Sequence, residues 1–202
     1  MTSPTDRTLA AYQDGVDAYF AGSPAGVPDP VVLLLEAVVA HVPPGGEVLE
    51  LGSGPGREAL HLEHRGLLVE RTNATPAFVD RLRHAGHQAR VLDVRHDDLG
   101  GPFDAVLANA VLLHLDRDDL APALRACHRA TRPGGVLALT LKEGDGEAWS
   151  DAKLSTPRWF VYWREEPLRQ ALSDAGWTVL RLDHVQGRLE PWLHALSRRD
   201  TT

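Results

Sequence analysis

Residues 48–57 read Val48-Leu49-Glu50-Leu51-Gly52-Ser53-Gly54-Pro55-Gly56-Arg57, a strand pattern followed by three alternating glycines and the start of a helix. Glycines at this spacing let the backbone turn sharply and approach a ligand, while the free amides of the next helix face that ligand. A dinucleotide-binding loop has two residues between its second and third glycines, but here only Pro55 separates them. The stretch therefore predicts a ligand site at a strand-to-helix turn, of a kind other than a dinucleotide loop.

Outward from this loop, short β-branched runs alternate with helical patterns. We expect strands at residues 47–51, 66–71, 89–94, 103–108, 135–141, 177–184 and 191–197. We expect helices at residues 9–20, 31–42, 57–64, 76–85, 118–131 and 165–175. Strands separated by helices form parallel sheets, whereas the short link before the last strand suits an antiparallel hairpin. The pattern predicts an α/β fold with a seven-stranded, mostly parallel sheet, helices on both faces and an antiparallel C-terminal strand hairpin.

The composition is that of one globular domain, because 43% of the 202 residues are hydrophobic and 24% are charged. We take residues 1–202 as a single domain, with residues 1–30 as an N-terminal flap and residues 142–165 as an insertion that covers the substrate. No apolar run approaches the roughly 20 residues of a membrane span, and the first residues show no signal pattern. We therefore expect a cytoplasmic protein with no membrane partner.

The charges and the ligand-type residues narrow the choice of partners. The formal net charge is -7, from 28 acidic and 21 basic residues. A nucleic-acid partner needs a basic face that neutralises phosphates, so we expect no nucleic acid and instead a small-molecule substrate. The one cysteine and the 10 scattered histidines lack the spacing of a metal site, so we expect no metal. Both a monomer and a homodimer fit the sequence.

Further motifs follow the glycine loop in a fixed order, at residues 69–78, 91–95, 103–115 and 132–137. Together they resemble the motifs of the class I S-adenosylmethionine-dependent methyltransferases, over about residues 12–196. The resemblance implies a Rossmann-like fold, S-adenosyl-L-methionine as the cofactor and S-adenosyl-L-homocysteine as its product. The arrangement Gly144-x-Gly146-Glu147 and residues 187–193 are similar to a subgroup of small bacterial methyltransferases whose substrates are mostly unassigned.

The resemblance also implies a set of cofactor contacts. Asn73 stands where the family usually has an aspartate for the ribose hydroxyls, and a neutral amide there predicts weaker binding. Asp93 takes the position that accepts a hydrogen bond from the adenine amino group. Without the resemblance, Asp93 is equally a solvated acid at a strand end, and Asn73 equally starts an Asx turn. The implied cofactor-binding residues are Glu50, Gly52, Ser53, Gly54, Gly56, Asn73, Asp93, Val94 and Asn109.

Two residues are candidates for catalysis. Methyl transfer from a sulfonium is an in-line displacement, for which the protein mainly aligns the partners and excludes water. A nucleophile that carries a proton also benefits from a base whose pKa lies near the working pH. His114 follows the fourth strand and Glu143 follows the fifth, both at the edge where open α/β sheets bind ligands. Packing or capping of the loop explains His114 equally well.

Aromatic residues and acids gather in the segments expected to cover this edge. They could form an aromatic-lined pocket around a small molecule, or they could seal a hydrophobic cap. Tyr12 and Tyr19 are seven residues apart and share one face of the expected N-terminal helix. The candidate substrate-binding residues are Tyr12, Tyr19, His114, Glu147, Trp149, Arg158, Tyr162 and Arg188.

These observations favour a methyltransferase that acts on an oxygen or nitrogen atom of a small molecule. A non-catalytic or regulatory protein that binds the same cofactor is an alternative, because Asn73 is unusual and no unambiguous base is present. An NADP-dependent reductase is another, since Arg71 could meet a 2′-phosphate, although the glycine spacing opposes it. A nucleic-acid methyltransferase is disfavoured, because residues 109–112 read Asn-Ala-Val-Leu and lack the Pro-Pro-aromatic pattern.

Overall fold

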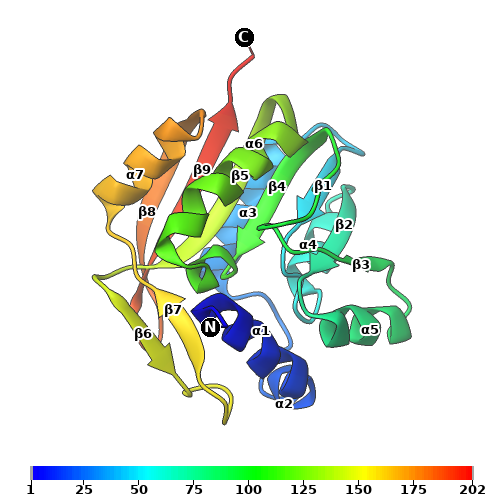
Figure 1. Cartoon of the computed structure of the whole chain (residues 1–202). Helices are drawn as coiled ribbons and strands as arrows, with labels where there is room; N and C mark the ends of the chain where they lie inside the picture. Colours follow the sequence, from blue (N-terminus) through cyan, green and yellow to red (C-terminus); the bar gives the residue numbers. More distant parts are fainter. Residues whose placement is uncertain (1, 202) are drawn as a thin grey trace.

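The computed structural model describes residues 2–201, so the two terminal residues of the expected domain lie outside it. Its centre is a seven-stranded sheet in the order β3-β2-β1-β4-β5-β9-β8 (Figure 1). Neighbouring strands from β3 to β5 are parallel, whereas β9 is antiparallel to both β5 and β8. The expected α/β fold with its antiparallel C-terminal hairpin is thereby confirmed. The sheet strands are β1 (Glu47–Glu50), β2 (Leu68–Asn73), β3 (Ala89–Val91), β4 (Phe103–Asn109), β5 (Thr131–Lys142), β8 (Trp177–Gln186) and β9 (Pro191–Arg199).

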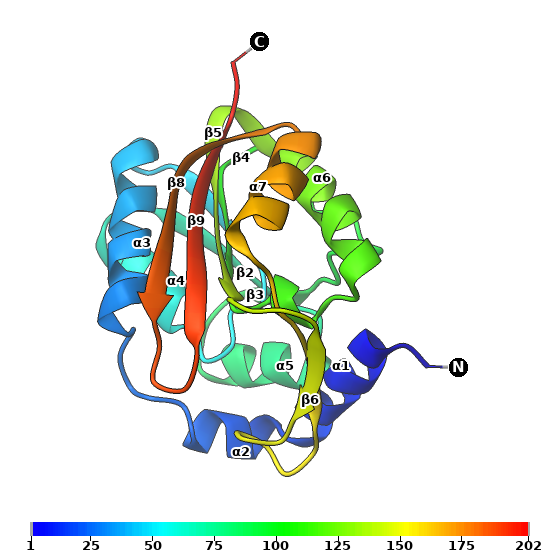
Figure 2. The ribbon, with the colours of Figure 1, turned by 90° about the vertical axis from the view of Figure 1, so that its left-hand side faces the viewer.

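Helices cover both faces of this sheet. In the edge-on view, α3 and α4 lie on one side and α6 and α7 on the other (Figure 2). None of the helices within residues 2–201 combines the length and the apolar character needed to cross a membrane. The helices are α1 (Pro4–Asp14), α2 (Val16–Ala21), α3 (Asp29–His41), α4 (Arg57–His64), α5 (Pro76–His84), α6 (Leu120–Ala130) and α7 (Glu165–Asp174), with 3-10 turns η1 (Leu112–His114) and η2 (Arg117–Asp119).

The side chains of β4 divide the interior into two cores. Ala105 and Leu107 pack in the core that α3 covers, whereas Val106 and Ala108 pack in the core that α6 covers. Successive side chains of a strand point to opposite faces, so a central strand with helices on both sides is buried at each of these positions. This explains why residues 105–108 of β4 are continuously apolar rather than alternating.

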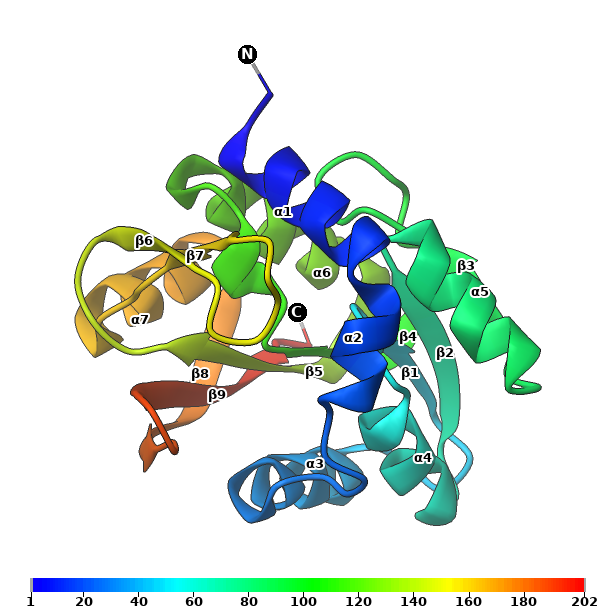
Figure 3. The ribbon, with the colours of Figure 1, turned by 90° about the horizontal axis from the view of Figure 1, so that it is seen from below.

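The strand order reverses between β1 and β4, and this reversal places a crevice at their carboxyl ends. The N-terminal helices α1 and α2 cross this edge beside a separate hairpin of β6 (Glu147–Ser150) and β7 (Arg158–Val161), as the view from below shows (Figure 3). The amide of Trp159 in β7 donates a hydrogen bond of 2.8 Å to the hydroxyl of Thr8 in α1. Segments distant in sequence thus jointly cover the edge that holds the glycine loop.

Two local expectations differ from the structure. The helix expected at residues 9–20 is two helices, because Gly15 ends α1 and its amide donates to the carbonyl of Ala11 at 3.0 Å. The segment expected as an irregular cover contains the β6–β7 hairpin, in which Trp149 pairs with Trp159 across the strands. Such an aromatic cross-strand pair stabilises a hairpin. Each of the two runs is short, and neither run by itself shows which residues it pairs with.

Candidate functional site

A cavity of about 1060 Å³, including its open mouth, lies at the carboxyl ends of β1, β2 and β4. Its walls come from the glycine loop, from the residues that follow these strands, and from α1 and α2. Small-molecule sites of open α/β sheets lie at such a reversal of strand order. The geometry of this edge is therefore that of a binding site for a small molecule or a cofactor.

The first two glycines of the loop line the cavity, and they place no side chain in it. Gly52 has a φ of +65°, and a Cβ added there would lie 2.5 Å from Cγ2 of Val111. Gly54 also lines the wall, with a φ of +51°. Gly56 has a φ of +83° and is the N-cap of α4, outside the cavity lining. The close backbone approach predicted for the loop is thus made by Gly52 and Gly54.

Glu50 places a buried carboxylate at the cavity wall, since its exposed fraction is 2%. Its Oε2 has no hydrogen-bond partner. Burial raises the pKa of Glu50 to about 8, and the charge of Glu58 adds to this, while a hydrogen bond with Ser53 opposes it. A buried polar atom without a partner costs free energy, which a cationic ligand group would offset. Ser53 lines the same wall and its hydroxyl accepts the Thr72 amide at 3.2 Å.

Asn73 ends β2 at the cavity wall. Its Oδ1 accepts a hydrogen bond from the amide of Thr75 at 2.9 Å, which forms an Asx turn ahead of α5. Both interpretations of this residue therefore apply at once, as turn former and as wall residue. The turn uses one lone pair of Oδ1, which leaves Asn73 one further acceptor site and its two Nδ2 donors for a ligand.

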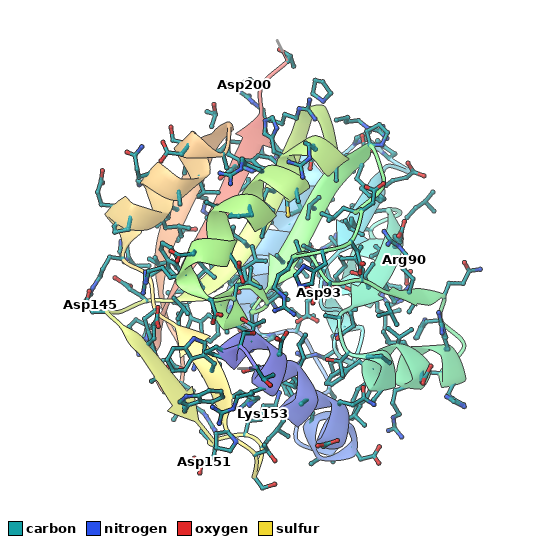
Figure 4. All side chains as sticks on the ribbon, in the orientation of Figure 1. Arg90, Asp93, Asp145, Asp151, Lys153 and Asp200 are labelled. Atoms are coloured by element: carbon teal, nitrogen blue, oxygen red, sulfur yellow. The ribbon has the colours of Figure 1, made fainter. Side chains whose placement is uncertain are left out.

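Asp93 and Val94 line the cavity beyond β3, and Figure 4 shows Asp93 between the sheet and the N-terminal helices. Arg95 holds the Asp93 carboxylate, with 2.7 Å between its Nη2 and Oδ2. The same nitrogen donates to Oδ1 of Asp6 in α1 at 2.8 Å. Although burial acts to raise it, the hydrogen bonds from Arg95 hold the pKa of Asp93 below its usual value. Asp93 is thus an ionised acceptor, and Arg95 fastens α1 beside it.

Asn109 belongs to a polar network that sequence reasoning recognised only in part. Its Nδ2 donates to Oε1 of Glu58 at 3.0 Å, and its Oδ1 accepts from the hydroxyl of Thr140 at 2.8 Å. Thr140 in turn accepts the amide of Ala110 at 2.8 Å. Ala110 has a φ of +55°, the one positive value of a non-glycine residue within residues 2–201. Strained backbone of this kind is common at functional sites, but no local sequence signal marks it.

His114 lies at the cavity wall between two fixed partners. Its Nδ1 is 2.6 Å from the carbonyl oxygen of Trp159, which only accepts, so Nδ1 carries the proton. Its Nε2 then accepts the hydroxyl proton of Tyr12 at 2.8 Å. Burial lowers the pKa of His114 to about 3, and the charges of Arg158 and Lys142 add to this. We expected His114 to be a base with a pKa near neutral pH, but its ring stays neutral and is a weak base.

A family model described as a methyltransferase domain matches residues 49–139. An uncharacterized methyltransferase of Synechocystis is 30% identical over 48% of this chain and 48% of its own length. An uncharacterized methyltransferase of Mycobacterium bovis is 32% identical over 71% of this chain and 56% of its own length. Residues 49–139 are therefore identified as a methyltransferase domain, and the chain is similar to methyltransferases over 71% of its length.

The methyltransferase domain also has relatives among solved structures. The Burkholderia thailandensis 1,6-didemethyltoxoflavin-N1-methyltransferase, solved with 1,6-didemethyltoxoflavin and S-adenosylhomocysteine bound, has a TM-score of 0.72 at 22% identity. The match covers 99% of this chain and 92% of that one, and it shows a shared fold. The chain spans about half the length of the two curated relatives.

The two acids predicted near the substrate lie away from the cavity of the methyltransferase domain. Oε2 of Glu143 is 2.9 Å from Nδ1 of His184, and Oε1 of Glu147 is 3.3 Å from Nε of Arg117. Both acids therefore have basic partners, and neither lines the cavity wall. The structure does not bring Glu143 to a position from which it could accept a proton there.

Three further candidates for substrate binding lie in or near the β6–β7 and β8–β9 hairpins and do not line the cavity. Trp149 packs against Trp159 with 5.2 Å between ring centroids, and the Tyr162 hydroxyl donates to Oε2 of Glu190 at 3.4 Å. Arg188 lies in the turn between β8 and β9. None of these three candidates lines the cavity, because the pairing of β6 with β7 and the turn after β8 direct them elsewhere.

The remaining substrate candidates gather around Tyr12. Tyr12 and Tyr19 both line the cavity, from α1 and α2 respectively, with 5.5 Å between their ring centroids in an edge-on contact. They share this site although a helix break separates them, which corrects the expected single helix face. Arg158 in β7 does not itself line the cavity, but it contacts a residue that does, because its Nη1 donates to the Tyr12 hydroxyl at 3.2 Å.

The structure does not support an NADP site or a metal site at this cavity. Arg71, the residue considered for a 2′-phosphate, donates from both terminal nitrogens to Glu63, at 2.6 and 2.7 Å. It is buried and does not line the cavity, so the NADP interpretation loses its supporting residue. Across residues 2–201, no group of three or more histidines, cysteines or acids is arranged to hold a metal ion.

Proposed function

We propose that this chain transfers a methyl group from S-adenosyl-L-methionine to an oxygen or nitrogen atom of a small molecule. The observation that supports this proposal is the cavity beside the glycine loop, where the buried Oε2 of Glu50 lacks a hydrogen-bond partner. The ammonium of the cofactor's methionine part would supply the missing donor and charge. The proposal includes a single domain over residues 1–202 with its flap and insertion, a cytoplasmic location, and a monomer or homodimer.

Each part of the cofactor has a suitable group in the cavity wall. Glu50 would hold the ammonium, and the backbone of Gly52 would pack against the methionine part. Asn73 would donate from Nδ2 to a ribose oxygen. Asp93 would accept from the adenine amino group, next to the backbone of Val94. The donors and acceptors of the wall thus fit the cofactor from end to end.

When bound, the cofactor supplies an electrophilic methyl group on a sulfonium. The acceptor's lone pair would take up this methyl group, and the electron pair of the broken C–S bond would remain on sulfur. Tyr12, Tyr19 and His114 would hold the acceptor in an aromatic-lined space and exclude water. Because His114 is not basic at neutral pH, the acceptor atom would have to carry no proton when the methyl group is transferred.

A second candidate function is binding of the cofactor without transfer. It is favoured by one observation, that burial raises the pKa values of Tyr12 and Tyr19 and lowers that of His114. These groups all line the cavity, so none of the three is poised to accept a proton at neutral pH. Methyl transfer then requires an acceptor that is already deprotonated or that needs no base.

Incubation with methyl-labelled cofactor and a bacterial small-molecule extract separates these functions. Methyl transfer predicts label in a product of low molecular mass with the wild type and none with Glu50→Gln. Cofactor binding without any labelled product would instead support the non-catalytic alternative. A change in NADPH fluorescence on mixing, without binding of S-adenosyl-L-homocysteine, would support the reductase and reject both.

A further inference from the structure

Within residues 2–201, Arg158 is a buried cation with no acidic partner. Its exposed fraction is 4%, and its hydrogen bond within residues 2–201 goes to the neutral Tyr12 hydroxyl at 3.2 Å. Its Nε has no partner at all. A guanidinium has five donors, and burying it without a carboxylate costs free energy that the rest of the fold must offset. Arg158 is thus built to receive a group that the chain itself does not supply.

The other buried cations of the chain show what normally satisfies such groups. Arg71 makes its two bonds to the carboxylate of Glu63. Lys142, buried beside the Phe160 ring, has its Nζ 2.7 Å from Oε1 of Glu190. Each of these two therefore has an acid in contact. Arg158 departs from this pattern where it touches Tyr12, a residue of the cavity wall.

A second cation stands close to the same wall. Nζ of Lys153 lies 3.4 Å from the centroid of the Tyr19 ring and donates to the hydroxyl of Ser23 at 3.2 Å. Figure 4 shows Lys153 over the N-terminal helices. Lys153 is exposed as a whole, yet partial burial of its ammonium lowers its pKa to about 8, and the charges of Arg158 and Arg57 add to this. Positive charge therefore collects here in a chain whose net charge is -7.

The two tyrosines connect these cations to the cavity. Tyr12 lines the cavity and its hydroxyl is the acceptor for Arg158, while Tyr19 lines it beside Lys153. A carboxylate that enters at this end would replace the Tyr12 hydroxyl on Nη1 of Arg158, and Tyr12 would keep its bond to His114. Exchange of a neutral acceptor for a charged one strengthens the bond to a guanidinium.

We infer that the methyl acceptor is an organic acid whose carboxylate binds Arg158 beside Tyr12. Lys153, beside Tyr19, adds electrostatic attraction for the carboxylate. This inference rests on the proposed function, because it assigns the substrate class of the same site. Specificity would come from the charge, because the buried guanidinium rejects a neutral isostere that leaves it unpaired.

The test uses full-length protein saturated with S-adenosyl-L-homocysteine, whose binding is measured first. Acetate, benzoate, malonate and citrate are titrated at constant ionic strength against the matching amides. We expect at least one acid to bind the wild type ten-fold or more tightly than its amide. Arg158→Gln should lose ten-fold or more of that affinity, and Arg158→Lys should lose less because it keeps the charge.

Arg117→Gln is the matched control. Arg117 also lies over a ring, 4.6 Å from the centroid of Trp163, but it pairs with Glu147 outside the cavity. This variant should bind the acids as the wild type does. If S-adenosyl-L-homocysteine binds but no acid exceeds its amide, the inference is wrong and the proposed function stands. Failure of S-adenosyl-L-homocysteine to bind rejects both, and if Arg158→Gln does not fold, the acid-to-amide ratio of the wild type decides.

Discussion

Tyr12 in α1 donates its hydroxyl proton to Nε2 of His114 over 2.8 Å, and this bond ties the N-terminal helix to the loop after β4. Both residues are half-buried at the cavity wall, and their burial raises the pKa of Tyr12 while it lowers that of His114. The pair therefore stays in one protonation state at neutral pH. Its role is to position the two side chains at the cavity wall rather than to exchange a proton.

Tyr12→Phe should destabilise the chain, because it leaves the buried Nε2 of His114 without a donor. The expected loss in the free energy of unfolding is about 1–3 kcal/mol, the cost of an unsatisfied buried acceptor. Urea unfolding of Tyr19→Phe provides the control, since its hydroxyl makes no hydrogen bond that we find within residues 2–201 and its loss should stay within about 0.5 kcal/mol. Equal losses in both variants would contradict the assigned bond.

The low pKa of His114 predicts a loss of stability in mild acid. The unfolded chain binds a proton at His114 below its ordinary pKa of 6.5, but the folded chain does so only near the lowered pKa of about 3. The contribution of His114 to the free energy of unfolding is therefore fully present above pH 6.5 and decreases as the pH falls from 6.5 toward 3. Between pH 7.5 and 5.5 the wild type should lose about 1.4 kcal/mol more than His114→Asn, as urea unfolding at both values would show. Parallel pH profiles would exclude the assigned shift.

Gly52→Ala should abolish cofactor binding, whereas Gly45→Ala should not. Both positions have a positive φ, +65° and +75°, so each substitution costs about 1–2 kcal/mol in backbone strain. Only at Gly52 does the added Cβ meet a neighbour, Cγ2 of Val111 at 2.5 Å, while Gly45 has open space. Calorimetry with S-adenosyl-L-homocysteine distinguishes them, and undiminished binding by Gly52→Ala would mean that the loop does not contact the ligand.

Asn73→Asp should tighten cofactor binding. The aspartate can keep the Asx turn to Thr75 with one oxygen and offer the other as a charged acceptor to a ribose hydroxyl. The expected gain is about ten-fold in affinity, or about 1.4 kcal/mol. Asn73→Ala is the comparison and should bind more weakly than the wild type. If Asn73→Asp folds and binds no better than the wild type, Asn73 does not face the ribose.

The sequence was sufficient for the sheet and for the glycine side of the cavity. The strand, the glycine loop and the helix at Arg57 are contiguous, so local patterns specify how they connect. The same holds for the wall position of Asn73, which follows directly from the end of β2. Features set by neighbouring residues along the chain were therefore predictable.

The rest of the site depends on contacts between distant segments. The neutral state of His114 results from burial under Tyr12 and from the carbonyl of Trp159, which is 45 positions away. Glu143 leaves the site because it meets His184, in another strand. No periodicity or local composition encodes such pairs, and so the sequence left the catalytic roles open between His114 and Glu143.

The central claim, that Glu50 and the glycine loop bind the cofactor, is tested most directly by calorimetry with S-adenosyl-L-homocysteine in two buffers of different ionisation enthalpy at pH 6.5. Burial raises the pKa of free Glu50 to about 8, and an ammonium against Oε2 would ionise it. We expect micromolar-range binding with release of about one proton by the wild type and none by Glu50→Gln. Absence of binding, or a binding enthalpy that is identical in both buffers, would contradict it.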